Sequence, residues 1–209
     1  MKLLVLGATG KTGRAIVADA LSRGHQVTIL ARNPDKAADL RPARIIPGDA
    51  RDPAAVANAL AGQDAAVSSL GTPVSPFREV TLLSDATRVL IHQMQQAGVA
   101  RLVAITGMGA GDSAGHGGLF FDWVFKPVML RKVYKDKNRQ EALIRESGLE
   151  WTILRPSVLN DQRPRGTVRI LTDLHGFHGG TIARRDVARI VLDELETPEL
   201  QCTIPLVTW

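Results

Sequence analysis

An apolar run followed by three evenly spaced glycines opens this chain and constrains its fold more than any other feature. The run is Leu3–Leu6, and the glycines are Gly7, Gly10 and Gly13. A wholly apolar run bounded by glycine is typical of a buried parallel strand, and the apolar spacing around Ile16 predicts a helix. Strand, glycine turn and helix in this order are typical of a dinucleotide-binding unit.

Each of the three glycines has a physical reason in such a unit. Gly7 permits the tight turn, Gly10 lets the backbone approach a pyrophosphate, and Gly13 lets the helix pack close to the strand. The N–H groups at the start of the helix, with the positive end of its dipole, hold the anion. We therefore predict a pyrophosphate-binding turn; the alternative is a glycine-rich turn with a structural role alone.

Strand-like and helix-like segments alternate along the rest of the chain. The predicted strands are 26–31, 43–47, 64–70, 101–106, 151–154 and 203–207, and the predicted helices are 34–40, 53–60, 79–96, 135–146 and 186–195. This alternation predicts an α/β fold: a Rossmann-like, doubly wound parallel sheet with helices on both faces, in a single domain over residues 1–209. Ligands bind such a sheet beyond the carboxyl ends of its strands. The insertions 107–131 and 157–185 are expected on that substrate side.

Composition excludes several classes of protein. Hydrophobic residues make up 44% of the chain, but no run approaches the roughly 18 apolar residues of a membrane span. The single cysteine, Cys202, excludes an internal disulfide and a cysteine-rich metal site. His175 and His178 have no third ligand nearby in the sequence, so we expect no metal. The strand-like N-terminus does not resemble a signal sequence, which favours a cytoplasmic protein.

The chain is basic, with a formal net charge of +5 and a pI near 9.8. Its basic residues are scattered rather than gathered in a tail, and aromatic residues make up only 4% of the chain. Stacking platforms for nucleic acid are therefore scarce, and this composition argues against nucleic-acid binding. A basic surface also attracts phosphorylated or carboxylated small molecules, which is the interpretation we favour.

The end of the second predicted strand indicates which nucleotide fits. An NAD-specific site commonly places Asp or Glu there to bond the ribose 2′-hydroxyl. This chain has Ala31-Arg32-Asn33-Pro34 instead, with Lys36 one helical turn further on. A guanidinium fork suits a 2′-phosphate, and a lysine adds a second charge. We therefore predict NADP(H) as the cofactor; the alternative is that Arg32 is an exposed loop arginine.

Several motifs together resemble the atypical short-chain dehydrogenase/reductases. The motifs are Gly7–Gly13, Ala31–Pro34, Gly48-Asp49, Ser69–Thr72, Gly109–Ser113 and Glu146–Pro156. Within that family the chain is most similar to the NAD(P)H-binding, NmrA-like proteins and to the small biliverdin-IXβ/flavin reductases. The resemblance spans nearly the whole chain. It is specific for fold and cofactor and much less so for substrate.

The resemblance implies a role for each matching residue. Thr9, Gly10, Lys11, Thr12 and Gly13 would meet the pyrophosphate, Arg32 and Lys36 the 2′-phosphate, Asp49 and Ala50 the adenine, Leu70, Gly71 and Thr72 the nicotinamide-side ribose, and Pro156, Ser157 and Val158 the carboxamide. Thr106 ends the fifth strand near the nicotinamide.

The chain departs from the family at the catalytic pair. Short-chain dehydrogenases usually carry Tyr-x-x-x-Lys, in which the lysine makes the tyrosine a better acid. Setting Lys137 on the family lysine places Val133, and not Tyr134, at the tyrosine position. Setting Tyr134 on the tyrosine puts Asn138 at the lysine position. Thr106 and Lys137 therefore remain the catalytic candidates, with Lys137 expected to bond the nicotinamide ribose or else to be a solvated lysine.

The segment 117–130 holds four of the nine aromatic residues. Its apolar residues favour a hydrophobic lid over a planar substrate or a surface for a partner or second copy, with burial against the sheet as the alternative.

Three functions fit these observations. The first is an NADPH-dependent reductase that passes hydride to an apolar conjugated acceptor such as a flavin, quinone, tetrapyrrole or enone, since these acceptors can take their proton from water. The second is a non-catalytic NADP(H)-binding, redox-sensing protein like the NmrA-like proteins. The third is an atypical epimerase or dehydratase. The expected partner is a small, planar, apolar molecule, and the protein is expected to be a monomer or homodimer.

Overall fold

A computed structural model of the chain describes residues 1–40, 44–72, 79–113 and 130–209. The strands are β1 (Lys2–Leu6), β2 (Gln26–Ala31), β3 (Arg44–Pro47), β4 (Ala65–Ser68), β5 (Arg101–Ile105), β6 (Glu150–Pro156), β7 (Val158–Asn160), β8 (Arg169–Leu171), β9 (Thr181–Ala183) and β10 (Leu206–Thr208). The α-helices are α1 (Lys11–Ser22), α2 (Pro53–Leu60), α3 (Leu82–Ala97), α4 (Arg131–Arg145) and α5 (Arg184–Glu196). Two 3₁₀ turns, η1 (Pro34–Ala37) and η2 (Gly111–Ser113), complete the described elements.

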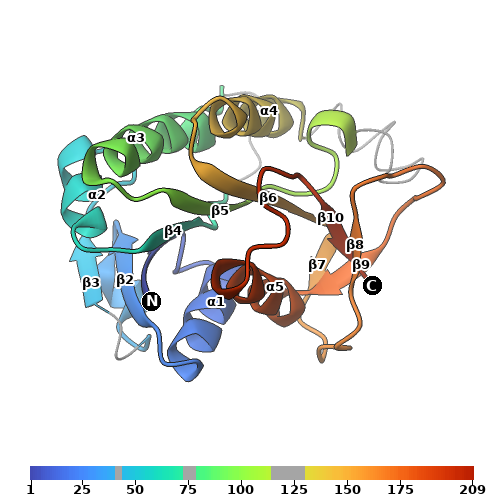
Figure 1. The fold of residues 1–209 in the computed structure, drawn as a ribbon, viewed down its shortest axis with the longest axis horizontal. Coiled ribbons are helices and arrows are strands. Elements are labelled where there is room, and N and C mark those ends of the chain that lie inside the picture. The colour runs from blue at the N-terminus through green and yellow to red at the C-terminus, as the bar shows by residue number, and fades with distance from the viewer. Residues whose placement is uncertain (41–43, 73–78, 114–129) are drawn as a thin grey trace.

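The central sheet is doubly wound, as the sequence predicts. Its strand order is β3-β2-β1-β4-β5-β6-β10-β8, and every pair is parallel except β10 with β8. Helices α1 and α5 cover one face, and α2, α3 and α4 cover the other (Figure 1). The strand order reverses between β1 and β4, and this reversal opens a crevice beyond their carboxyl ends.

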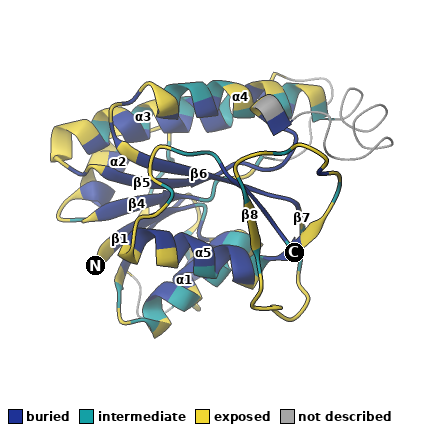
Figure 2. Ribbon diagram, turned by 45° about the vertical axis from the view of Figure 1, so that its right-hand side comes forward, coloured by how far each residue is buried: buried dark blue, intermediate teal, exposed yellow. Residues whose placement is uncertain are grey.

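The first strand shows why the sheet has two core layers. Successive side chains of a strand point to opposite faces. Leu3 and Val5 accordingly pack with the core under α1 and α5, whereas Leu4 and Leu6 pack with the core under α2, α3 and α4. All four are fully buried, and the neighbouring strands β4, β5 and β6 are also mostly buried along their length (Figure 2). A run buried on both faces has to be apolar throughout, which explains the continuous pattern in the sequence.

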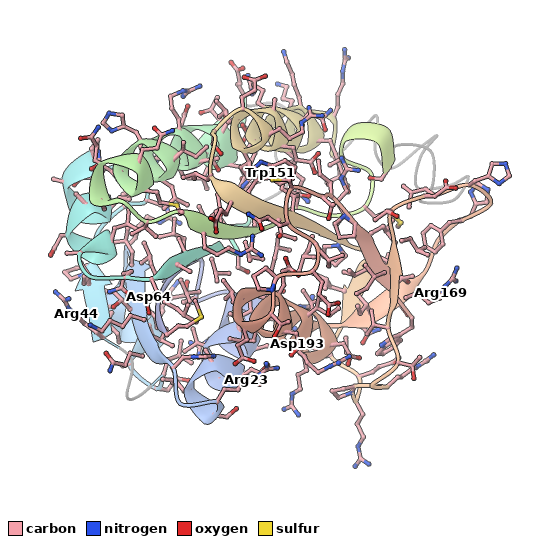
Figure 3. All side chains as sticks on the ribbon, viewed as in Figure 1. Arg23, Arg44, Asp64, Trp151, Arg169 and Asp193 are labelled. Atoms are coloured by element: carbon pink, nitrogen blue, oxygen red, sulfur yellow. The ribbon has the colours of Figure 1, made fainter. Side chains whose placement is uncertain are left out.

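Polar contacts fix the positions of neighbouring helices relative to one another. Arg23, at the end of α1, donates to Asp193 of α5 at 2.8 Å, and Figure 3 labels both residues. On the opposite face, Asp136 of α4 is fully buried and caps α3: its carboxylate accepts from the backbone N–H of Leu83 at 2.8 Å and from the Ser84 hydroxyl at 2.5 Å. Asp136 directly precedes Lys137, so this cap also fixes the part of α4 that carries the candidate lysine.

Several predicted boundaries differ from the structure. The predicted helix 34–40 is a 3₁₀ turn at Pro34–Ala37, the last strand is Leu206–Thr208 instead of 203–207, and α4 begins at Arg131 instead of residue 135. Short connectors often close with 3₁₀ bonds, because they lack the length to pack a full helical face. The segment 157–185 contains β7, β8 and β9, which the sequence analysis did not predict. Residues 117–129 of the predicted apolar lid lie outside the described residues.

Candidate functional site

The glycine turn after β1 is shaped by two close backbone approaches. Gly7 has φ +79°, and a Cβ built on it would lie 2.3 Å from the carbonyl oxygen of Ser69. A Cβ on Gly13 would lie 2.2 Å from the carbonyl oxygen of Gly7. Both positions are glycine because the fold leaves no room for a side chain.

Gly10 is different, because the fold does not require glycine there. Its φ is −79°, which any residue adopts, and a Cβ built on it would meet only the carbonyl oxygen of Gly7, at 3.4 Å. Gly10 precedes α1, and no side-chain hydrogen bond caps the start of this helix. The first N–H groups of a helix need a partner from outside the helix. An open backbone beside uncapped N–H groups fits a pyrophosphate, which the turn would hold through its main chain.

A cavity of about 440 Å³ opens between this turn and α4. It is lined by Gly10, Lys11, Thr12, Gly13, Ser69, Leu70, Gly71, Thr72, Ile105, Thr106, Leu130, Val133, Tyr134, Lys137, Leu159 and Arg184. The structure therefore brings four of the five predicted pyrophosphate residues, the predicted ribose residues and both catalytic candidates into one site, whereas Thr9 does not line the cavity. These residues come from distant parts of the chain, and they meet because the carboxyl ends of β1, β4 and β5 share one edge of the sheet.

Lys137 contributes a desolvated ammonium to this cavity. Its Nζ donates a hydrogen bond to the carbonyl oxygen of Thr106 at 2.7 Å. Burial lowers the pKa of Lys137 to about 8, and the negative charge of Glu141 opposes part of that shift. The amine thus titrates close to physiological pH, and a nearby ligand that carries negative charge would stabilise its protonated form.

The hydroxyl of Thr106 faces a buried ion pair. Its Oγ1 donates to Oε1 of Glu141 at 2.7 Å. Glu141 also accepts from Arg155, at 3.0 Å from Nε and 2.6 Å from Nη2. The side chains of Glu141 and Arg155 are only 3% and 4% exposed. The hydroxyl proton of Thr106 is therefore directed at Glu141, and the carbonyl of Thr106 is the group that contacts Lys137.

Tyr134 lies in the wall of the same cavity. Its hydroxyl donates to the carbonyl oxygen of Met108 at 2.7 Å, and the Nζ of Lys137 lies 5.1 Å from the centre of its ring. Residues three apart on a helix share a face, as do residues four apart. The displaced Tyr134–Lys137 spacing therefore still brings both side chains to one site, which the comparison of registers in the sequence did not indicate.

Basic side chains surround the predicted adenosine end of the site. Hydrogen bonds from Arg51 hold the pKa of Asp49 down to about 2, and the positive charge of Arg32 acts in the same direction. Arg51 donates to the Asp49 carboxylate at 2.9 and 3.0 Å. Arg14 donates to the carbonyl oxygen of Lys36. The sequence analysis named Arg32, Lys36 and Asp49 but missed Arg14 and Arg51.

The three residues predicted beside the carboxamide do not line the cavity. The carbonyl of Pro156 accepts from the N–H of Met108 at 2.9 Å. The Ser157 hydroxyl is buried and donates to Thr208 at 2.9 Å, and Val158 is exposed and pairs with Gly180 through its backbone. In their place, Leu159 reaches the cavity wall.

The described ranges contain neither a metal-ligand cluster nor a membrane-spanning helix. Across residues 1–40, 44–72, 79–113 and 130–209, no three His, Cys, Asp or Glu side chains gather as metal ligands. Within the same ranges, no helix is long and apolar enough to cross a membrane.

Comparison with known proteins identifies the family. Residues 7–198 match the model of the NAD(P)H-binding family. The chain belongs to this family. This membership confirms the predicted nicotinamide cofactor and the predicted resemblance to atypical short-chain dehydrogenase/reductases at the level of the family.

Similar proteins extend over the whole chain. The uncharacterized sugar epimerase YhfK of Bacillus subtilis (strain 168) is 28% identical over 202 residues, which are 94% of this chain and 88% of that protein. The anaerobillin reductase ChuY from Escherichia coli O157:H7 is 25% identical, with a TM-score of 0.84 over 100% of this chain and 97% of that one. A short-chain dehydrogenase/reductase from Veillonella parvula DSM 2008 in complex with NADP is 16% identical, with a TM-score of 0.78 over 100% of this chain and 94% of that one, and shows the fold alone. These likenesses confirm the Rossmann-like, single-domain fold.

Proposed function

We propose that this NAD(P)H-binding protein is an NADPH-dependent reductase that transfers hydride to an apolar conjugated acceptor, such as a flavin, quinone, tetrapyrrole or enone. The observation that carries the proposal is the cavity that joins the glycine turn to Lys137 through apolar walls that include Leu70, Ile105 and Leu130. Bound NADPH supplies two electrons as hydride, and the acceptor gains that hydride together with one proton. The likeness to ChuY supports a tetrapyrrole as one candidate acceptor.

The chain's own residues bind and orient the two molecules. Thr9, Lys11, Thr12 and the three glycines would hold the pyrophosphate, Leu70, Gly71 and Thr72 the nicotinamide-side ribose, and Asp49 and Ala50 the adenine. Lys137 would donate to ribose hydroxyls from its ammonium, while the carbonyl of Thr106 holds that ammonium in place. Fixed positions of this kind reduce the entropy that the reaction has to overcome.

NADP(H) fits the adenosine end better than NAD(H). The residue after β2 is Arg32, where an NAD-specific site commonly carries an acid. Arg32 and Lys36 are exposed, and Arg14 lies against the backbone of Lys36. A 2′-phosphate placed among these cations would gain charge-assisted hydrogen bonds.

The hydroxyl groups of the cavity favour an acceptor that takes its proton from water. Tyr134 and Thr106 direct their hydroxyl protons at Met108 and Glu141, so neither points a proton toward a substrate. An epimerase or dehydratase that uses the family's tyrosine would need such a group. A conjugated acceptor does not, because the charge left after hydride transfer is delocalised until solvent protonates it.

Steady-state oxidation of NADPH tests the proposal. The wild-type protein would be assayed against a panel of quinones, flavins and linear tetrapyrroles, with Gly10→Val as the control for background oxidation. We expect turnover with at least one of these classes. Tight NADPH binding without turnover on any of them would contradict a reductase. It would favour the second candidate, a non-catalytic NADP(H)-binding redox sensor, which the engaged hydroxyls of Tyr134 and Thr106 also allow.

A further inference from the structure

Arg184 lies in the wall of the candidate cavity, although it is 171 residues from the last glycine of the turn. It is the first residue of α5, and its side chain is 21% exposed. Its Nη1 donates to Oδ1 of Asp161 at 2.7 Å. The other oxygen of the same carboxylate, Oδ2, accepts from Nζ of Lys11 at 2.8 Å. One carboxylate therefore bridges a predicted pyrophosphate ligand and an arginine from the far end of the chain.

The charge around this bridge is strongly positive. A second hollow of about 530 Å³ lies beside the cavity and shares Lys11 and Arg184 with it. Its walls carry three more arginines, Arg14, Arg163 and Arg185, and among the described residues that line it Asp161 is the one acid. Within those same residues, Arg163 and Arg185 have no ion pair. Arg14 pairs with Asp39, which lies outside this lining, at 2.6 Å. Asp161 offsets only part of the remaining positive charge, and an additional anion would be stabilised here.

The geometry of the bridge matches a phosphate group. Lys11 and Arg184 each donate to a different oxygen of one carboxylate. Their donor atoms are therefore spaced to form hydrogen bonds with two oxygens that are bonded to the same atom. A phosphate presents oxygens in the same way, and a guanidinium suits it well. Lys11 is also the first residue of α1, whose uncapped N–H groups fit a pyrophosphate. The two helices α1 and α5 run side by side (Figure 1), and the first residue of each lines the same cavity.

From this geometry we infer that Arg184 is a second cation for the cofactor's pyrophosphate, acting opposite Lys11, and that Asp161 sets the spacing of the two side chains. The inference rests on the cofactor site of the proposed function but not on any reaction there. It assigns a binding role to the start of α5, within the segment that the sequence analysis expected only on the substrate side.

A matched pair of arginine variants tests the assignment. Arg184→Ala removes the side chain that lines the cavity, whereas Arg185→Ala removes its neighbour, which lines the adjacent hollow but not the cavity. Binding would be measured by calorimetry for NADPH and for adenosine 2′-phosphate, which lacks the pyrophosphate. We expect Arg184→Ala to weaken NADPH about tenfold or more and to leave adenosine 2′-phosphate within about twofold. Arg185→Ala should leave both ligands within about twofold.

A third variant, Arg184→Lys, distinguishes loss of the positive charge from an altered fold in Arg184→Ala. It keeps a positive charge beside Asp161, so it should recover part of the NADPH affinity lost in Arg184→Ala. Unchanged NADPH affinity in Arg184→Ala would overturn the inference, as would an equal loss in Arg185→Ala or an equal loss for the two ligands. If the wild-type protein fails to bind NADPH, the proposed function is wrong. If the wild type binds NADPH and the Arg184 variants bind it equally tightly, the inference about Arg184 alone is wrong.

Discussion

Binding of NADPH near pH 8.5 should draw about three-quarters of a proton onto Lys137. Burial lowers the pKa of this lysine to about 8, so in the free protein about a quarter of the amine is protonated at that pH. An anionic cofactor beside the ammonium favours the charged form. If binding returns the pKa to the ordinary lysine value of about 10.4, the amine becomes almost fully protonated.

The sign of the pH dependence follows from this uptake. Because the bound state holds more protons than the free state above pH 8, affinity falls as the pH rises. The same two pKa values predict NADPH binding about tenfold weaker at pH 9 than at pH 7. Below pH 7 the amine of Lys137 is charged in both states, and its contribution to the pH dependence vanishes.

Calorimetry in buffers of different ionisation enthalpy measures the proton uptake directly. Two variants serve as controls: Lys137→Met has no titrating amine, and Lys137→Arg keeps a charge that does not titrate in this range. Both should take up no proton near pH 8.5, and only Lys137→Arg should keep tight binding at pH 7. Zero uptake by the wild type, or an undiminished uptake in Lys137→Met, would refute the placement of Lys137 beside the cofactor.

Three further substitutions test other parts of the site. Gly10→Val should leave the melting temperature unchanged, because φ at Gly10 is −79°, which valine also adopts. It should abolish NADPH binding, because the added side chain would enter the space for the pyrophosphate. Normal NADPH affinity by calorimetry would contradict the pyrophosphate-binding turn. Arg32→Ala should lose much of the preference for NADPH over NADH, with a cost of roughly 1.5–3 kcal/mol, and a wild type that binds both cofactors equally would contradict the assignment. Tyr134→Phe should keep turnover within a few-fold of wild type, because its hydroxyl donates to the carbonyl of Met108; a drop of about a hundredfold with normal NADPH binding would restore a tyrosine acid.

Much of the fold was predictable because the pattern is local. Leu3–Leu6 had to be apolar on both faces, and Gly98 ends α3 with φ +69°, as a stop signal should. The short strands β7, β8 and β9 were not predictable in the same way. Each has three residues, two of them pair with each other and the third pairs with β10, and such pairing depends on partners far away in the chain.

The site shows the same division. Gly10, Arg32 and Lys137 were predicted as site residues from motif, position and helix register. Glu141 was missed, although its spacing of four from Lys137 puts both residues on one face of α4 and was a usable signal. Arg155 gave a weaker signal, as a charged residue at the end of an apolar strand. Its pairing with Glu141 depends on how β6 and α4 pack.

The amino-acid sequence by itself determined the class of fold, the glycine turn after β1 and the nicotinamide cofactor, because each depends on residues within about one helix or strand of one another. The tertiary structure alone decided which side chains share the cavity. It turned the Thr106 hydroxyl toward Glu141, placed Tyr134 beside Lys137 despite the displaced spacing, and brought Arg184 to Lys11 through Asp161. These contacts join elements that become neighbours only when the whole sheet has formed. A local sequence pattern therefore does not predict which distant residue each side chain will contact.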